Sequence, residues 1–206
     1  MAEPARPAPF QLPLSINSRT MTRGWRPALA AALALLTLAC SQRFEWREVR
    51  VDEGAVAALP GRPQKVTRDL DVGGQPVSMT MWSTGVGATM FAVGVARLPA
   101  ALSAEPDGRA QAIAHFRDGL VRNIGGAVTA SVPPVLALPP GSARRLFASE
   151  AVEAVGRTGP DGRKSRLAAR FFIVDDQLFQ VVALGAEGEI PPEVLDTFFT
   201  SFRLAS

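Results

Sequence analysis

Short connections between strand-like segments restrict the fold of this chain more than any other feature. Residues 64–72 and 75–83 are separated only by the glycine pair 73–74, and residues 164–174 and 178–184 by three residues. Connections this short join antiparallel neighbours, whereas parallel strands need a crossover of a dozen residues or more. The sequence therefore predicts two β-hairpins.

Alternating apolar residues extend this pattern into a meander. In residues 75–83, Val77, Met79 and Met81 lie on one face of the predicted strand, and residues 89–96 alternate again from Thr89 onward. Two further strands are expected, one at 44–51 and a weaker one at 147–155. Residues 59–63 carry two prolines and predict a turn, and the proline-rich residues 132–141 predict a surface loop.

Two helices complete the pattern. The first has Asp107 as its expected N-cap and Gly125 as its expected stop, with apolar residues at helical spacing between them. Gly119 in its middle costs about 1 kcal/mol relative to alanine, so this helix depends on packing. The second helix opens with two prolines and an acid at residues 191–193.

These segments predict one α+β domain over residues 40–206, with a core at about 44–204. The expected fold is a curved antiparallel sheet of about six or seven strands, flanked by two helices. Four stretches, 59–63, 91–93, 178–181 and 198–202, resemble the PsbP-like fold, which a photosystem II subunit shares with a Ran-binding nuclear import factor. The resemblance implies a fold and an extracytoplasmic setting, and it implies no active site.

The N-terminal segment has the pattern of an export signal. Arg23 and Arg26 precede the apolar stretch 27–39, whose 13 residues are fewer than the ~20 that a spanning helix needs. Residues 21–39 are accordingly predicted to be a signal peptide. Residues 1–20 are interpreted as a misassigned start or an unstructured extension.

Cys40 follows this stretch directly, as in the lipobox of bacterial lipoproteins. Thr37 occupies the position where the usual lipobox has leucine. We expect lipid attachment at Cys40, because an exported chain whose one cysteine stays a free thiol is otherwise a redox liability. Two alternatives remain open at this point: ordinary secretion after cleavage at Ala39, and an uncleaved anchor. By analogy with enteric lipoproteins, Ser41 favours the outer membrane.

The net charge is concentrated at the N-terminus. The whole chain has 22 basic and 19 acidic side chains. Four of the basic side chains, all arginines, and only one acidic side chain precede Ser41. Residues 41–206 are therefore neutral overall. Since phosphate contacts need a concentrated positive surface, we expect no nucleic-acid partner.

Few residues have the type and spacing expected of a catalytic, metal-binding or cofactor-binding site. His115 is the single histidine and is expected on the solvated stripe of its helix, with no nucleophile in a recognisable pattern nearby. Asp175 and Asp176 are expected to serve a turn, because a calcium site needs about six oxygen ligands. Residues 85–90 lack the third glycine of a dinucleotide loop and predict a turn. We expect no catalytic residue, metal or cofactor.

A cluster of basic residues lies on one predicted hairpin: Arg157, Arg163, Lys164 and Arg166. It is either a contact for anionic lipid or lipopolysaccharide, or a solvated hairpin that prevents edge pairing. Trp46 and Trp82 are expected in the core more than in a pocket.

These observations favour a non-enzymatic binding or accessory module of the bacterial cell envelope. It would be attached to a membrane through its lipid, face the periplasm, and contact an envelope protein. A soluble periplasmic or secreted form is the alternative location. The alternative functions are a small-molecule or lipid carrier, with a cavity lined by residues such as Met79, Met81 and Phe91, and an unrecognised hydrolase using His115 or a carboxylate pair.

Overall fold

The computed structural model describes residues 44–52 and 54–205. The predicted signal peptide and Cys40 lie outside the described residues. Within the described part, three helices are α2 (Ala100–Ser103), α3 (Pro106–Asn123) and α4 (Pro192–Ser201). The strands are β1 (Trp46–Val51), β2 (Ala55–Pro60), β3 (Gln64–Val72), β4 (Gln75–Val86), β5 (Thr89–Arg97), β6 (Ala127–Val132), β7 (Leu146–Thr158), β8 (Arg163–Val174), β9 (Gln177–Ala186) and β10 (Arg203–Leu204).

The strands form two sheets in which every neighbouring pair is antiparallel. The larger sheet has seven strands in the order β3-β4-β5-β9-β8-β7-β6, and the smaller has the order β1-β2-β10. Both predicted hairpins are confirmed: Val72 pairs with Gln75 across the glycine turn, and Val174 pairs with Gln177. The α+β class with an antiparallel sheet is therefore confirmed.

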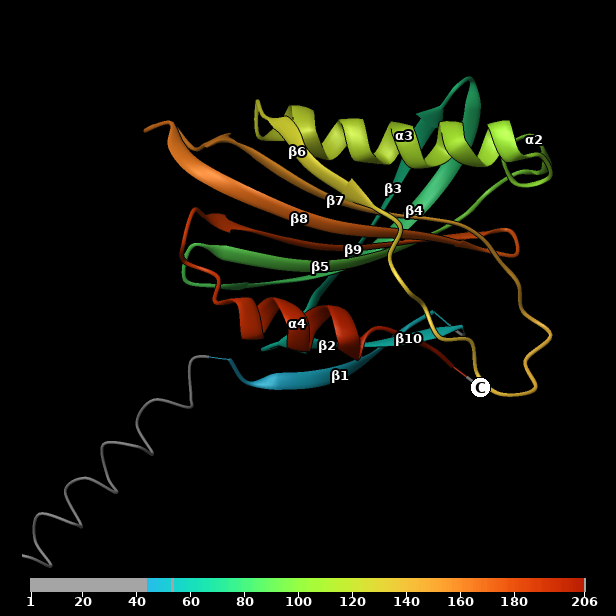
Figure 1. Ribbon diagram of the computed structural model, residues 1–206, viewed down its shortest axis with the longest axis horizontal. Coiled ribbons are helices and arrows are strands. Elements are labelled where there is room, and N and C mark those ends of the chain that lie inside the picture. The colour runs from blue at the N-terminus through green and yellow to red at the C-terminus, as the bar shows by residue number, and fades with distance from the viewer. Residues whose placement is uncertain (1–43, 53, 206) are drawn as a thin grey trace, which may run out of the picture. The chain divides into compact units, whose positions relative to one another are not determined.

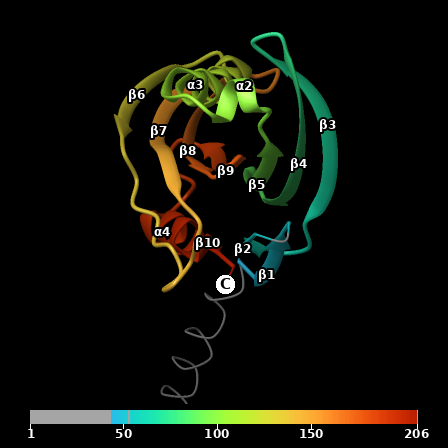
Figure 2. The ribbon, with the colours of Figure 1, turned by 90° about the vertical axis from the view of Figure 1, so that its right-hand side faces the viewer.

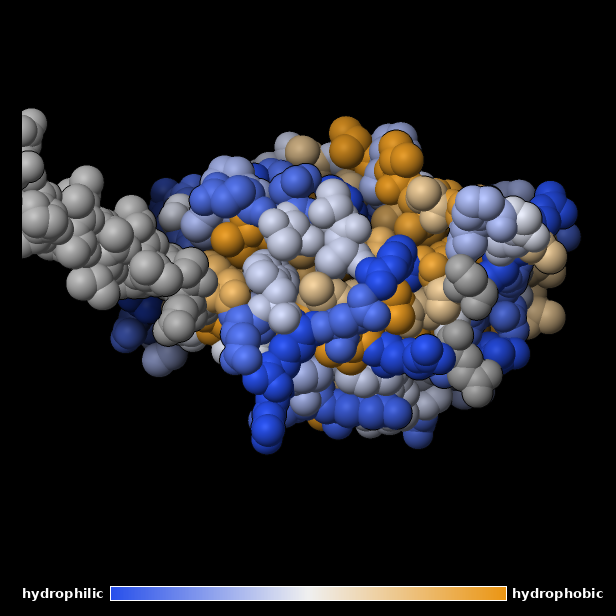
Figure 3. Space-filling view, turned by 90° about the horizontal axis from the view of Figure 1, so that it is seen from below, coloured by the Kyte–Doolittle hydropathy of each residue, from blue (hydrophilic) through white to orange (hydrophobic). Residues whose placement is uncertain are grey.

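The large sheet has a separate core on each face. In Figures 1 and 2, α3 lies over one face, while α4 and the three-stranded sheet lie over the other. Successive side chains of each strand point to opposite faces of the sheet, so the same strands contribute to both cores. Trp82, Phe91 and Phe198 belong to the core under α4, and Val77, Phe116 and Phe171 to the core under α3. Seen from the α4 side, hydrophilic side chains cross the surface and the apolar ones lie in smaller groups between them (Figure 3).

Several predicted boundaries are wrong. The turn predicted at 59–63 is partly strand, because β2 continues through Pro60 at a point where Leu59 is fully buried. Asp107 is not the N-cap of α3: Glu105 has that place and Pro106 begins the helix, so Asp107 lies in the first turn. Gly125 does end the helix, with the positive φ of 53° that favours glycine.

Some elements have little or no sequence signal. Strand β6 has only exposed side chains and forms the edge of the large sheet. The single-turn helix α2 and the two-residue β10 are too short for a periodic pattern. Their positions depend on contacts with distant residues, such as the pairing of Leu204 with Ala55.

Candidate functional site

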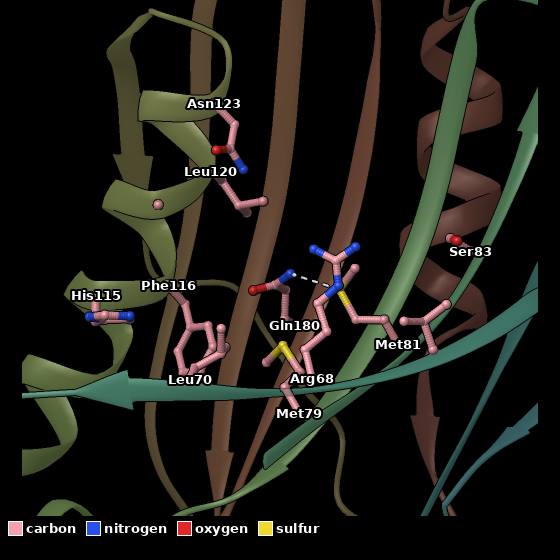
Figure 4. A pocket seen from close by; sticks show the side chains of 12 residues that line it. Arg68, Leu70, Met79, Met81, Ser83, His115, Phe116, Leu120, Asn123 and Gln180 are labelled. Atoms are coloured by element: carbon pink, nitrogen blue, oxygen red, sulfur yellow. Dashed lines mark hydrogen bonds between the residues drawn. The ribbon is translucent and has the colours of Figure 1, made fainter. Parts of the chain in front are cut away.

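A cavity lies between α3 and one side of the large sheet (Figure 4). Its volume is about 360 Å³, and its walls come from β3, β4, β9 and α3. This volume is near the lower end of the ~300–1,000 Å³ that small-molecule sites occupy. The cavity can therefore admit a small ligand.

Side chains from alternate positions of β3 and β4 form most of the cavity floor. Every second residue of β3 and β4 faces α3, and those that line the cavity are Val66, Arg68, Leu70, Met79, Met81 and Ser83. Methionine side chains are flexible and polarizable, so they adapt to ligands of different shape. The floor is therefore mainly apolar and deformable.

A glycine in the middle of the sheet allows the methionine side chains of the floor to lie over strand β5. Gly94 of β5 pairs with Met81 on one side and with Gln180 on the other. A Cβ added at Gly94 would come within 3.2 Å of Met81 Cγ and 3.3 Å of Met79 Sδ. The missing side chain leaves room for Gln180 and Met81 to meet across the β5 strand.

Gln180 is a buried polar group in these surroundings. The residue is 3% exposed, and its Nε2 donates to Met81 Sδ at 3.7 Å (Figure 4). A thioether sulfur is a weak acceptor. Among the described residues the carboxamide has no other hydrogen bond, so it retains capacity to bind a group that enters the cavity.

Helix α3 forms the opposite wall. His115, Gly119 and Asn123 recur at intervals of four and lie in one row beside Phe116 and Leu120. A Cβ added at Gly119 would meet nothing closer than Arg122 Nη2 at 4.0 Å. The glycine thus leaves open space at the cavity wall, at a position where a larger side chain would project into it.

Among the described residues, the charged side chain that lines the cavity is that of Arg68. Arg68 extends from β3 toward the space below α3, and His115 borders it from the helix (Figure 4). In the described part of the chain, Arg68 has neither a hydrogen bond nor an ion pair. No aspartate or glutamate of the described residues lines the cavity. The site therefore has a positive charge without an internal counter-ion.

His115 is less exposed than a solvated stripe alone would make it. It is half-buried, and its ring meets Phe116 edge-on at 5.6 Å between centroids. The residue borders the cavity between α3 and strands β3 and β4, which the pattern of the helix by itself did not indicate.

An ion-pair network fixes α3 against the sheet. Arg117 Nε donates to Asp118 at 2.9 Å, and its Nη1 donates to Glu150 of β7 at 3.2 Å. The hydrogen bond to Asp118 is the main cause that raises the pKa of Arg117, and Glu150 adds to it against the effect of burial. Arg117 therefore helps to hold the helix wall of the cavity in place.

The predicted basic cluster lies on the β7–β8 hairpin, away from the cavity. Two of its members have carboxylate partners: Lys164 contacts Glu187 at 3.5 Å and Arg166 contacts Glu153 at 2.9 Å. Arg157 donates to the backbone carbonyl of Gly162, while Arg163 is exposed at the hairpin end. The hairpin is thus partly neutralised.

The paired aspartates serve the turn and its arginine contacts. Asp175 has a positive φ of 55° and accepts from Arg144 Nε at 3.0 Å, and Asp176 accepts from Arg97 at 3.1 Å. Within residues 44–52 and 54–205, no group of three or more His, Cys, Asp and Glu could hold a metal ion. Both carboxylates are therefore engaged structurally.

The aromatic candidates lie on the opposite face of the sheet. Phe91 packs against Trp46 and Phe198, with ring centroids 6.1 and 5.1 Å away, and Trp82 belongs to the same core. Of the three residues expected to line a carrier cavity, Met79 and Met81 do so and Phe91 does not. The register explains this, since Phe91 pairs with Thr84, whose side chain shares the Trp82 face.

Sequence reasoning missed Arg68, Gly94 and Gln180. Arg68 alternates with Val66 and Leu70, a charge on an otherwise apolar strand face, and this was a usable signal. Gly94 and Gln180 had none, because only the pairing of β5 with β9 brings them together.

Comparisons with known proteins leave the function open. No protein-family model and no curated protein matches the chain. Among solved structures, one similar chain is a protein of unknown function from Pseudomonas aeruginosa, with 12% identity and a TM-score of 0.33 over 74% of this chain and 87% of that one. Among the described residues, no helix has the length and apolar character needed to cross a membrane.

Proposed function

We propose that this chain is a non-enzymatic binding module that holds a small ligand in the cavity between α3 and the large sheet. The observation that carries the proposal is the cavity itself, with its apolar floor and Gln180 as a buried polar group. Binding sites commonly combine apolar walls with a few polar groups that orient the ligand. The arrangement supports the carrier form of a binding module.

A glycine supports this role. Gly119 of α3 lines the cavity and lacks a side chain at a position where one would project into it. A glycine inside a helix or strand costs about 0.5–1 kcal/mol relative to alanine. A glycine that keeps open space in the cavity wall, despite this loss of stability, suits a site that a ligand fills.

The location belongs to the same proposal. The basic residues before the apolar stretch and Cys40 after it support export and attachment to a membrane through lipid, with the domain facing the periplasm. The antiparallel sheet with helices on both faces supports assignment to the PsbP-like fold.

The experiment measures binding of a neutral apolar fluorophore, N-phenyl-1-naphthylamine, to the purified full chain. We expect saturable binding with one site per chain. The variant Gly119→Leu should abolish it by filling the cavity. Ala110→Leu is the matched control, because Ala110 is exposed on the same helix and does not line the cavity.

Two results would count against the proposal. One is fluorescence that rises with dye concentration without saturating. The other is equal binding by Gly119→Leu and Ala110→Leu, since the dye would then lie elsewhere. Circular dichroism spectra of both variants establish that the fold is retained.

A further inference from the structure

We infer that the ligand of this cavity is a monoanionic amphiphile, a carboxylate with an apolar tail such as a medium-chain fatty acid. The inference rests on the proposed binding function and specifies its ligand class. It follows from the charge, the hydrogen-bonding groups and the apolar surface that meet in one place.

The charge argument begins with Arg68. Arg68 is exposed and lines the cavity without an ion pair in the described residues, whereas Arg97 and Arg166 of the same sheet contact carboxylates at 3.1 and 2.9 Å. A guanidinium presents a planar fork of donors that matches a carboxylate. An anionic head group would give Arg68 the partner that the protein does not supply.

Gln180 provides a second, independent observation. It is almost fully buried, lines the cavity, and among the described residues its carboxamide hydrogen-bonds only to a sulfur. A carboxylate oxygen is a much better acceptor for this amide than a thioether. The donors that line the cavity are the Arg68 guanidinium, the amides of Gln180 and Asn123, the Ser83 hydroxyl and the His115 ring. Arg68 is the one permanent charge among them, and a single positive charge suits one negative charge better than the nearly two charges of a phosphate monoester.

The apolar part of the ligand has a matching surface. Met79, Met81, Phe116 and Leu120 line the cavity around the polar groups. Burial of apolar area contributes about 25 cal/mol per Å², so a tail in this space adds affinity that a bare anion lacks. The volume of about 360 Å³ limits the tail to a short or medium chain.

The test displaces N-phenyl-1-naphthylamine from the full chain with four ligands that each contain an unbranched chain of eight carbons: octanoate, octyl phosphate, octanol and octylammonium. We expect octanoate to compete best, with octanol and octylammonium each weaker by about tenfold or more. Arg68→Met should remove the preference for octanoate over octanol, because it keeps an apolar stem and deletes the charge. Arg62→Met is the matched control: Arg62 lies outside the cavity on an exposed turn, and its replacement changes the net charge equally.

The outcomes separate the two proposals. If the fluorophore binds in the cavity but octanol competes as well as octanoate, and Arg68→Met changes neither, the ligand class is wrong and the binding function stands. Preference for octylammonium or octyl phosphate also overturns the class. If Arg62→Met and Arg68→Met weaken octanoate equally, the charge acts at long range and the assigned contact is wrong. If the fluorophore fails to bind in the cavity at all, both proposals fall.

Discussion

The two faces of the large sheet are packed in different ways. Under α4, Phe91, Phe198 and Trp46 form an aromatic cluster with ring centroids 5.1–6.5 Å apart. A second pocket, of about 380 Å³, lies on this face between α4 and strands β6, β7 and β8. Under α3, a buried core at one end gives way to a cavity floored by Met79 and Met81. We therefore expect the loss of a ring from the aromatic cluster to destabilise the chain more than the loss of a ring that borders the cavity.

The largest effect on stability is expected in the aromatic cluster under α4. Phe91→Ala should lower the free energy of unfolding by about 3–5 kcal/mol, because the ring is fully buried and its removal leaves a cavity. Phe116→Ala should cost clearly less, because that ring already borders open space. Urea unfolding of both variants measures the difference, and equal losses would contradict the comparison.

The next effect concerns the junction between the two sheets. Arg144, with 21% of its side chain exposed, donates to Asp175, to the backbone carbonyl of Gly54 and to Gln177 at 2.6–3.1 Å. It thereby ties the β1–β2 turn to the β8–β9 turn. We expect Arg144→Ala to destabilise the chain by about 2 kcal/mol, because it leaves these partners without their donor.

Two controls sharpen this result. Arg145→Ala removes the neighbouring charge, whose guanidinium stacks over the exposed Phe147, and should cost much less. Arg144→Lys should recover only part of the loss, since an ammonium lacks the planar fork. Full recovery by lysine would show that charge alone matters there.

A smaller effect, of opposite sign, is expected on the open face. Gly119→Ala should stabilise the chain by about 0.5–1 kcal/mol, because the position is helical and the added methyl meets open space. Gly125→Ala, at the end of the same helix, should destabilise it by about 1 kcal/mol, because its φ is +53°. Thermal unfolding of the pair tests this, and a loss of stability in Gly119→Ala would show that the space is not open.

The smallest effect is expected at the β7–β8 hairpin. Lys164→Gln deletes an exposed ion pair with Glu187, and such pairs contribute about 0–1 kcal/mol. Stability should therefore change by less than about 0.5 kcal/mol. A larger loss would mean that the hairpin contributes to stability in a way that its exposure does not indicate.

The elements that sequence reasoning predicted well are those with local signals. The glycine turn at 73–74 and the alternation of β4 define one hairpin, and the prolines before Glu193 define the start of α4. Strand β6 was missed because all its side chains are exposed, so it has no hydrophobic pattern. Asp107 was misplaced as the N-cap because an acid is as favourable in the first turn of a helix as at the cap.

The sequence by itself determined the strands of the two hairpins, their tight turns and the two main helices, because their signals lie within a few residues of one another. The tertiary structure alone decided where the cavity lies. Only the pairing of β5 with β9 places Gly94 beside Gln180, and only the packing of α3 on the sheet brings His115 and Gly119 to the same cavity as Arg68. The physical reason is that the position of a cavity depends on the space that side chains distant in sequence leave unfilled. No local sequence pattern contains that information.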